Sequence, residues 1–262
     1  MVEICTMPAH ATGCLLCGED LAYATVAQEK TCDLCHLTAS STAACIHGHF
    51  ICDACHRGSA ADVIEQLCRQ TTSVDPIALS TELMRSPVIN MHGPEHHFLV
   101  PAVLLATYDN AQGRSEQKQA HLAVARQRAD RLPGGFCGTH GNCGAAVGTG
   151  VFWAIVSGAT PLSCEPWSQS NRMTARSLLR IADYGGPRCC KRDCYLAILA
   201  AMEELSRLDG VARSSTTPTC EHSVRNRECT QSNCPFFPVL AATRKTAEMT
   251  PMDPPRDRIG KD

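Results

Sequence analysis

The sequence predicts a mainly α-helical protein that carries a small zinc-ribbon or RING-like module at its N-terminus. The first observation is that the 18 cysteines are grouped along the chain, several of them as C-x2-C pairs. The second is that residues 58–210 contain segments with apolar positions at helical spacing, separated by Gly and Pro. The third is a globular composition, with 44% hydrophobic and 19% charged residues among 262. We therefore expect a module at residues 10–57, a helical domain at 58–210, a cysteine-rich segment at 211–240 and a flexible tail at 241–262.

The charge and the lack of a long apolar stretch argue against nucleic-acid and membrane binding. The net charge is −2 and aromatic residues make up 5%, so neither a basic field nor a base-stacking platform is expected. Residues 141–164 carry no charged side chain, but their apolar centre at 151–156 is far shorter than the roughly 20 residues of a membrane-spanning helix. Residues 1–8 lack the basic and apolar regions of a secretion signal, so a cytoplasmic location is expected. In that compartment grouped cysteines favour metal binding over disulfides.

Two cysteine pairs predict the first part of a zinc module. Cys14-Leu-Leu-Cys17 and Cys32-Asp-Leu-Cys35 are separated by 14 residues, within the range found in zinc ribbons. Between the pairs, residues 21–26 predict a short hairpin strand of the kind that ribbons contain.

A second set of ligand types follows, with His47 and His56 as spare histidines. Structural zinc takes four tetrahedral sulfur or nitrogen ligands, so eight candidates fit two ions. The candidates are Cys14, Cys17, Cys32, Cys35, Cys45, His49, Cys52 and Cys55. Sequential pairing joins the first four and the last four, whereas a cross-brace joins Cys14 and Cys17 to Cys45 and His49, and Cys32 and Cys35 to Cys52 and Cys55. The stretch Gly48-His49-x2-Cys-x2-Cys resembles the middle of some RING fingers, but the usual following pair is absent, so we expect structural zinc and not ubiquitin chemistry.

Four segments before residue 133 predict helices. Ser59 suits the N-cap of a helix over residues 60–68, and Asp75-Pro76 suits the start of a second helix. Residues 98–106 are almost all apolar and predict a buried helix with a kink at Pro101. Residues 112–132 are polar and basic with a few apolar positions, which indicates a solvated amphipathic helix.

Polar side chains precede the apolar helix, in the segment Met91-His-Gly-Pro-Glu-His-His97. His92, Glu95 and His96 have the chemistry of metal ligands or general bases. The alternative is an ordinary helix start, in which Glu95 interacts with the helix dipole and the histidines are hydrogen-bonded nearby.

A glycine-rich stretch carries Cys137, His140 and Cys143 at a C-x2-H-x2-C spacing, just before a helix predicted from Cys143 to Ser157. Soft ligands this dense indicate a metal or cluster site. The helix dipole is expected to lower the pKa of a thiol at its N-terminus. Gly144 and Gly148 lie four residues apart, so a neighbour can pack closely on that face. A dinucleotide site is not expected, because no strand precedes these glycines.

A second cysteine cluster begins the last predicted helix. A helix over residues 171–182, with Met173, Leu178, Ile181 and Ala182 on its inner side, is broken by Tyr184-Gly-Gly-Pro187. Cys189 and Cys190 then start a helix through Met202, and Cys190 and Cys194 share one face of it. A vicinal thiol pair can be redox-active, and Lys191 and Arg192 beside it can stabilise thiolates or bind an anion. The alternative is that the thiols are simply packed.

Three cysteines of residues 211–240 suggest another centre. Cys220, Cys229 and Cys234 follow a polar linker at a C-x8-C-x4-C-P spacing. They can hold an iron–sulfur cluster, or zinc together with His222.

Several motifs together are similar to an uncharacterised cysteine-rich prokaryotic family of unknown function. They are residues 137–150, Gly185-Gly-Pro-Arg-Cys-Cys-Lys-Arg192 and Met91–His97, and residues 48–56 are similar to the family's zinc-finger-like start. The resemblance covers most of residues 14–240. The family is found largely in anaerobes and methanogens, and some members are joined to SAM-dependent methyltransferase domains. The resemblance implies a methyltransferase or another protein as partner, and no settled reaction.

These observations lead to three hypotheses about function. The leading one is an iron–sulfur-dependent enzyme of sulfur, redox or lyase chemistry, in which thiols bind the cofactor, histidines move protons and basic side chains hold an anionic substrate. The cofactor-binding candidates are Cys137, Cys143, Cys189, Cys190, Cys194, Cys220, Cys229 and Cys234. The catalytic candidates are His92, Glu95, His96, His140, Lys191 and Arg192. The alternatives are a non-enzymatic zinc-binding adaptor for a partner such as a methyltransferase, and a metal or sulfur carrier.

Overall fold

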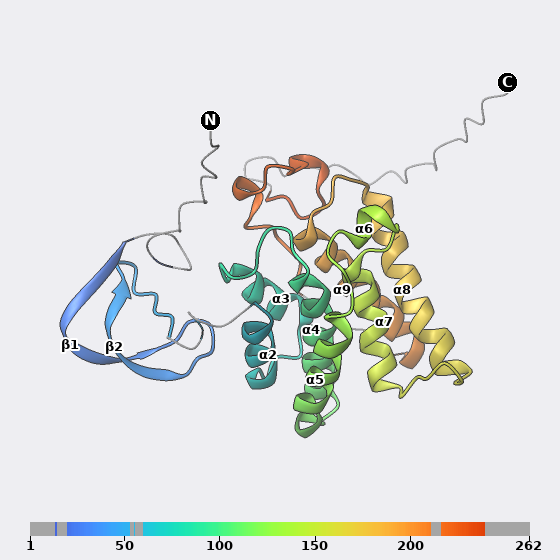
Figure 1. Cartoon of the computed structure of the whole chain (residues 1–262), viewed down its shortest axis with the longest axis horizontal. Helices are drawn as coiled ribbons and strands as arrows, with labels where there is room; N and C mark the ends of the chain where they lie inside the picture. Colours follow the sequence, from blue (N-terminus) through green and yellow to red (C-terminus); the bar gives the residue numbers. More distant parts are fainter. Residues whose placement is uncertain (1–13, 15–19, 53–54, 56–59, 211–215, 239–262) are drawn as a thin grey trace, which may run out of the picture.

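The computed structural model describes residues 14, 20–52, 55, 60–210 and 216–238. The predictions about Cys17, His56, the cap at Ser59 and the tail at 241–262 lie outside these residues. Figure 1 shows a helical bundle with a small two-stranded module on one side and a C-terminal segment over one end of the bundle. The prediction of a mainly α-helical fold with a ribbon-like N-terminal module is confirmed.

The module is built on one antiparallel hairpin. β1 (Leu21–Thr31) pairs with β2 (Thr38–Cys45), from Leu21 opposite Cys45 to Thr31 opposite Thr38, with an irregularity between Tyr23 and Gln28. β1 contains the predicted strand, but β2 was not predicted, because its run of Thr, Ala and Ser lacks large alternating side chains. β1 is almost entirely exposed, and in β2 only Cys45 is fully buried, so the hairpin contributes little apolar core of its own.

The rest of the described chain is helical. The helices are α2 (Ala60–Gln70), α3 (Pro76–Arg85), α4 (Glu95–Ala111), α5 (Lys118–Ala129), α6 (Phe136–Thr139), α7 (Gly144–Val156), α8 (Glu165–Tyr184) and α9 (Cys190–Asp209). Short 3-10 turns are η1 (Ser115–Gln117), η2 (Ser223–Arg225) and η3 (Gln231–Asn233). None of the helices in the described part of the chain is both long and apolar enough to span a membrane.

α4 forms the centre of the bundle. It is apolar on every side, and it packs against α2, α3, α5, α7 and α9. Residues 98–107 of α4 are buried, as the sequence predicts for this segment, and the helix continues through Pro101. A β-carbon on Gly148 of α7 would lie 2.7 Å from Cδ of Pro101, so the glycine lets α7 approach α4 as predicted.

α8 is longer at its N-terminus than predicted, because it begins at Glu165 with Pro166 in its first turn. It packs against α7 and α9, with Met173 buried as predicted. The predicted inner residues Leu178 and Ile181 are not fully covered: Ile181 is half-buried and the side chain of Ser177 lies in the interface in their place, 3.0 Å from the hydroxyl of Thr149. This small polar contact lets α7 and α8 pack closely.

The C-terminal segment at residues 216–238 is attached to the helical domain by contacts along its length. Asp75 accepts hydrogen bonds from Ile77 and Ala78 as the N-cap of α3, and its second carboxylate oxygen accepts from the amide of Thr216 at 2.8 Å. The guanidinium of Arg85 donates to Glu221 at 2.7 Å. The ring of Phe236 contacts the ring of Tyr195 edge-on, at 5.3 Å between centroids. The segment is therefore part of the packed domain.

Candidate metal centres and a thiol-lined cavity

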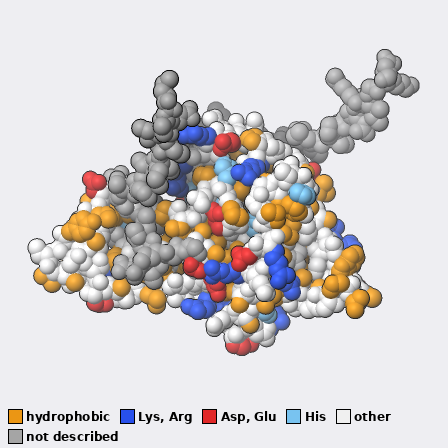
Figure 2. All heavy atoms as spheres, viewed as in Figure 1, with side chains coloured by type: hydrophobic (Ala, Val, Ile, Leu, Met, Phe, Trp, Pro, Cys, Tyr) orange, Lys and Arg blue, Asp and Glu red, His pale blue; other side chains and the backbone are white. Residues whose placement is uncertain are grey.

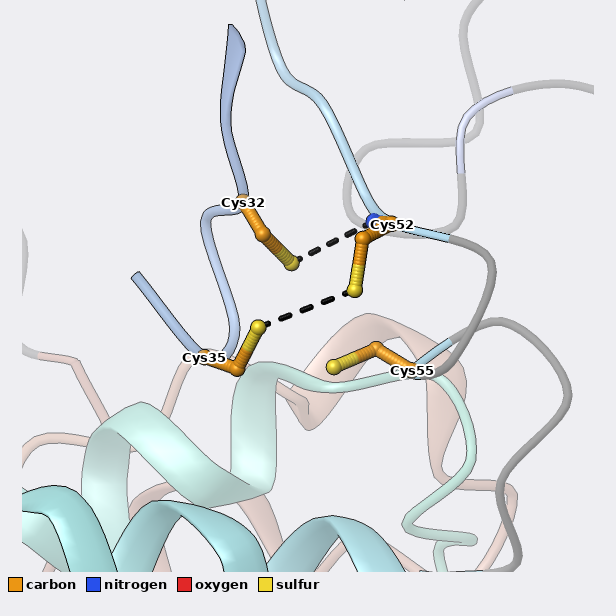
Figure 3. A group of neighbouring side chains, drawn as sticks. All are labelled: Cys32, Cys35, Cys52 and Cys55. Atoms are coloured by element: carbon orange, nitrogen blue, oxygen red, sulfur yellow. Dashed lines mark hydrogen bonds between the residues drawn. The ribbon is translucent and has the colours of Figure 1, made fainter. Parts of the chain in front are cut away.

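Four buried cysteines of the module form a group that fits one metal ion. The sulfurs of Cys32, Cys35, Cys52 and Cys55 all lie within 4.8 Å of one another, and Figure 3 shows them pointing toward a common centre. The sulfurs of Cys35 and Cys52 are 3.6 Å apart. Metal–sulfur bonds of about 2.3 Å in a tetrahedron place two sulfurs about 3.8 Å apart, so this spacing fits a site for one tetrahedral metal ion.

Backbone contacts bring the two halves of this four-cysteine group together. The amide of Asp33 donates to the carbonyl of Phe50 at 2.8 Å, and the Asp33 carboxylate accepts from the Phe50 amide at 2.6 Å. The amide of Cys52 donates to the sulfur of Cys32 at 3.3 Å. The turn at residues 32–35 is thereby fixed against the segment that leads to Cys52.

The pKa values of these thiols indicate that the four-cysteine group requires a bound cation. Burial raises the pKa of Cys35 to about 11 and also raises the pKa of Cys55. At Cys32 burial acts in the same direction, but hydrogen bonds from the backbone of Cys52, Cys35 and Leu34 outweigh it and lower the pKa. Four thiolates this close need a cation, and a bound metal ion deprotonates its thiol ligands.

A second group in the module contains Cys14, Cys45 and His49, whose ligand atoms also lie within 4.8 Å of one another. The sulfur of Cys14 is 3.7 Å from Nδ1 of His49, and the sulfur of Cys45 accepts from the amide of His47 at 3.3 Å. The geometry of both groups follows the cross-brace pairing and not the sequential pairing. The fourth candidate of this group, Cys17, lies outside the described residues.

The helical domain contains a cavity of about 220 Å³, called here the central cavity. Three thiols from separate elements line it: Cys137 of α6, Cys143 just before α7 and Cys190 at the start of α9. The other polar side chains that line it are His92, His96, His97, Arg188 and Asp193. The enzyme hypothesis from the sequence grouped Cys137, Cys143, Cys189, Cys190 and Cys194 with His92, His96 or His140. Of these, Cys137, Cys143, Cys190, His92 and His96 line the central cavity, and the others do not.

The central cavity lies where α4, α7 and α9 begin, so backbone amides point toward it. Amides of Ala145 and Ala146 stabilise the thiolate of Cys143, and the amide of Gly93 stabilises that of Cys190. The predicted lowering of the thiol pKa at this helix end is nevertheless wrong. Burial, followed by the nearby carboxylate of Asp193, raises the pKa of Cys143 to about 12, and burial raises the pKa of Cys190.

The three histidines of the cavity are held in fixed orientations. His96 is 1% exposed, its Nδ1 lies 3.1 Å from the carbonyl of Gly93, and its Nε2 has no partner among the described residues. Burial lowers the pKa of His96 to about 4, so the ring is neutral and Nε2 presents a lone pair. Burial also lowers the pKa of His97, whose Nδ1 lies 3.3 Å from the carbonyl of Leu132. Metal ligands and substrate-binding histidines have this kind of backbone support.

His92 connects the central cavity to the protein surface. Its Nε2 lies 3.3 Å from the side-chain oxygen of Asn226 and 3.3 Å from the carboxylate of Glu228. The Glu228 side chain is 52% exposed. Nδ1 of His92 is buried and has no partner in the described part of the chain.

Four of the predicted catalytic residues are used elsewhere in the fold. Glu95 accepts from the amide of Asn90 at 2.9 Å, and exposed His140 stacks on Phe136 at 4.5 Å between ring centroids. Buried Lys191 donates to the carbonyls of Met84 and Ile89 at 2.8 and 3.1 Å. Burial and the nearby Arg225 lower the pKa of Lys191 to about 8.

Arg192 donates to the carboxylate of Asp193 at 3.1 Å and to the carbonyl of Gly185 at 2.9 Å. Lys191 and Arg192 therefore hold neighbouring loops in place through these hydrogen bonds. The basic side chain in the lining of the central cavity is Arg188, which the sequence did not single out and which follows the predicted break before α9.

A wider groove of about 600 Å³ adjoins the central cavity. It shares Cys137, Cys143, Arg188 and Asp193 with the cavity and continues along Leu178 and Ile181 of α8. A small molecule can reach the thiols by this route.

The remaining predicted cofactor ligands separate into two places. Cys189, Cys220, Cys229 and Cys234 line a second, small cavity of about 20 Å³, called here the C-terminal cavity. Cys194 is fully buried, and its sulfur lies 3.9 Å from the carbonyl oxygen of His96. It lines neither cavity. Burial raises its pKa well above the usual value, as in a core thiol.

Comparison with known proteins identifies a family but not a function. No curated protein and no solved structure matches the chain. A family described as a family of unknown function (DUF5714) matches residues 64–237, which span the helical domain and the C-terminal segment and leave out the N-terminal module. This confirms the resemblance to an uncharacterised family, and since the match covers more than half of the chain, the protein belongs to the DUF5714 family of unknown function.

Proposed function

We propose that this protein is a metalloenzyme whose helical domain binds an iron–sulfur cluster in the central cavity and whose N-terminal module is stabilised by zinc. The observation that carries the proposal is the convergence of Cys137, Cys143 and Cys190 on one cavity of about 220 Å³. Cysteine thiolates are the usual ligands of iron–sulfur clusters. One water molecule needs only about 10–15 Å³ on this measure, so the cavity has room for a polyatomic group and a small substrate.

Three thiols leave one ligand position for a substrate, as catalytic metal sites do. A cluster with such a position would supply Lewis-acid or one-electron chemistry. Backbone amides at the start of α7 and just before α4 favour the negative charge of the Cys143 and Cys190 thiolates. The raised pKa values of Cys143 and Cys190 agree with this role, because a bound cation offsets the cost of burying their thiolates.

The side chains around the thiols suggest how a substrate is held. The neutral His96 ring presents a buried Nε2 atom as a hydrogen-bond acceptor. His92 lines the cavity and contacts the exposed carboxylate of Glu228, so we assign it proton transfer between cavity and solvent. Arg188 belongs to both the cavity and the adjoining groove, which favours an anionic small molecule.

The test is the metal content of the full chain purified without oxygen. We expect a coloured protein with iron, acid-labile sulfide and zinc, and we expect Cys143→Ser and Cys190→Ser to lose iron while keeping the zinc of the module. Cys164→Ser is the matched control, because Cys164 is exposed and lines neither cavity. Wild-type protein that contains zinc alone, or thiol variants with unchanged iron, would contradict the proposal.

A second candidate function is docking of a protein partner by the N-terminal module. The module exposes large apolar side chains, whose contact with water is unfavourable: Tyr23 is 74% exposed, Val26 70% and Ile46 56%. Figure 2 shows apolar surface on this part of the molecule. A SAM-dependent methyltransferase is the partner we would test, by calorimetric titration. Replacement of Tyr23 and Val26 by Ser should weaken binding, whereas Cys190→Ser should not.

A further inference from the structure

The C-terminal cavity is surrounded by four thiols from two distant parts of the sequence. Cys189 lies at the start of α9, whereas Cys220, Cys229 and Cys234 belong to the C-terminal segment. The cavity volume of about 20 Å³ is close to the space of a single small ligand. Four cysteine thiolates are the usual ligand set of an iron–sulfur cluster.

Hydrogen bonds to the sulfurs support this interpretation. The amide of His222 donates to the sulfur of Cys220 at 3.3 Å, and the amide of Gln231 donates to the sulfur of Cys229 at 3.4 Å. In both cases the donor lies two residues after the cysteine. The same arrangement occurs in the module, where the amide of His47 donates to Cys45 at 3.3 Å. N–H donors of this kind stabilise a thiolate more than a thiol.

Cys189 receives similar support from a side chain. Nδ2 of Asn226 lies 3.5 Å from its sulfur, and the Oδ1 atom of Asn226 accepts from the amide of Glu228 at 3.2 Å. Asn226 is 8% exposed, so this contact is buried. Three of the four thiols thus have N–H donors directed at them.

The alternative nitrogen ligand of this segment is already engaged. Nδ1 of His222 lies 2.9 Å from the guanidinium of Arg225. The sequence left open whether His222 completes a zinc site. His222 and Cys189 both line the cavity, and because Arg225 engages Nδ1 of His222 we take Cys189 as the fourth ligand. The small buried core of the segment, with Phe236 as its one large apolar side chain among the described residues 216–238, also favours a metal as the group that holds the turns together.

We infer that Cys189, Cys220, Cys229 and Cys234 are the four thiolate ligands of an iron–sulfur cluster that fastens the C-terminal segment to the start of α9. Their sulfurs do not all lie within 4.8 Å of one another as those of the module do, so they are too far apart for a single zinc ion. This centre is separate from the central cavity, because Cys189 and Cys190 are adjacent in sequence but line different cavities. Its existence does not depend on the proposed enzyme function. A fully ligated centre beside an open one serves structure or electron transfer and does not bind substrate.

The first test uses the full chain purified without oxygen and measures zinc, iron and acid-labile sulfide per chain. Cys220→Ser and Cys229→Ser should each lose the metal of one centre, whereas exposed Cys164→Ser should keep the wild-type content. Cys190→Ser should lose the metal of the central cavity and keep that of the C-terminal centre. Loss of iron together with sulfide supports the cluster, whereas loss of zinc alone contradicts it. Unchanged metal content in Cys220→Ser and Cys229→Ser overturns the inference.

A second measurement applies if the variants do not fold. Native wild-type protein is treated with an alkylating reagent before and after a chelator, and the modified cysteines are identified by mass spectrometry. Cys189, Cys220, Cys229 and Cys234 should be protected together and become reactive together as metal is released. Alkylation of these four thiols at the same rates with and without chelator overturns the inference.

Discussion

At the start of α9, two neighbouring cysteines belong to different sites. Cys189 is the N-cap residue of α9 with an extended backbone, whereas Cys190 is the first residue of the helix. Cys190 therefore lines the central cavity with Cys137 and Cys143, while Cys189 lines the C-terminal cavity. The vicinal pair therefore does not act as a dithiol. Cys194 shares a helix face with Cys190 but is one turn deeper, where the core covers it completely. Cys189 and Cys190 at the start of α9 thus line cavities, whereas Cys194, one turn further along, is packed in the core.

A first prediction concerns His96, whose pKa is lowered to about 4 from an ordinary value of 6.5 by burial. The unfolded chain takes up the proton first, so this group's contribution to stability is complete above pH 6.5 and is lost as pH falls toward 4. Each pH unit in that window changes the free energy of unfolding by up to about 1.4 kcal/mol. Urea unfolding at pH 7.5, 6.5 and 5.5 should show a smaller loss on acidification in His96→Gln than in wild type. Exposed His140→Gln is the control and should follow wild type, and parallel curves for all three proteins would remove His96 from this role.

At the scale of elements, local sequence decides where most helices begin, and small residues decide how closely they pack. Pro76 and Pro166 sit in first turns, where a missing amide costs nothing. α7 uses glycines where it meets its neighbours: a β-carbon on Gly144 would lie 2.1 Å from the His97 ring. This close approach shapes the wall of the central cavity.

A second prediction tests the cap of α3. Asp75→Ala removes the acceptor for Ile77 and Ala78 and also the contact to Thr216, so it should lower the free energy of unfolding by about 1–2 kcal/mol. Asp75→Asn keeps an acceptor oxygen and should cost less. Urea unfolding of the three proteins measures the difference. Equal losses in both variants would show that the charge matters and the cap does not.

A third prediction tests the contact between α4 and α7. In Gly148→Ala the new methyl group meets Cδ of Pro101 at 2.7 Å and Cβ of Val100 at 3.2 Å. Since the core has no room to shift freely, we expect a loss of roughly 1–3 kcal/mol, seen as a lower Tm. Gly138→Ala in α6 is the matched control, because nothing lies within 4 Å of its β-carbon position. A Gly148→Ala protein as stable as this control would show that the helices can separate at little cost.

At the scale of the whole molecule, the two parts of the chain have different sources of stability. The helical domain has a continuous core around α4 with many side chains at 0% exposure. The module has a small cluster in which Leu34 and Phe50 surround the four-cysteine group. One cross-contact joins the imidazole of His36 to Glu82 of α3 at 3.0 Å. The family match begins in α2 and does not include the module.

A fourth prediction follows from this difference. A chelator at neutral pH should unfold the module and leave the α-helical signal in far-ultraviolet circular dichroism nearly unchanged, because the module depends on metal and the bundle on apolar burial. Limited proteolysis should then cut within residues 21–52 and spare residues 60–210. The double variant Cys32→Ser with Cys52→Ser should give the same pattern without chelator. Loss of most helical signal on chelation would mean that the bundle also needs metal to fold.

Much of the secondary structure was accessible from the sequence for local reasons. The apolar run at 98–106, the Asp75-Pro76 start and the break at residues 184–187 are signals within one turn of the residues they affect. β2 and the first turn of α8 were missed, because small or polar side chains give no period to detect. The contacts of Lys191 show a further limit, since it donates to the carbonyls of Met84 and Ile89, at the end of α3 and just after it, which no local pattern records. Arg192 donates to the carbonyl of Gly185 in the loop just before α9.

The sequence by itself determined that this is a mainly helical protein with grouped thiols, since composition, helix capping and ligand types are properties of short stretches. Only the tertiary structure decided which sulfurs meet. It placed Cys32 and Cys35 with Cys52 and Cys55, and it separated Cys189 from Cys190. Burial likewise reversed the acidity expected of Cys143 at a helix start. The physical reason is the same in each case: distances and desolvation come from packing between segments far apart in the chain, and spacing along the sequence carries no record of them.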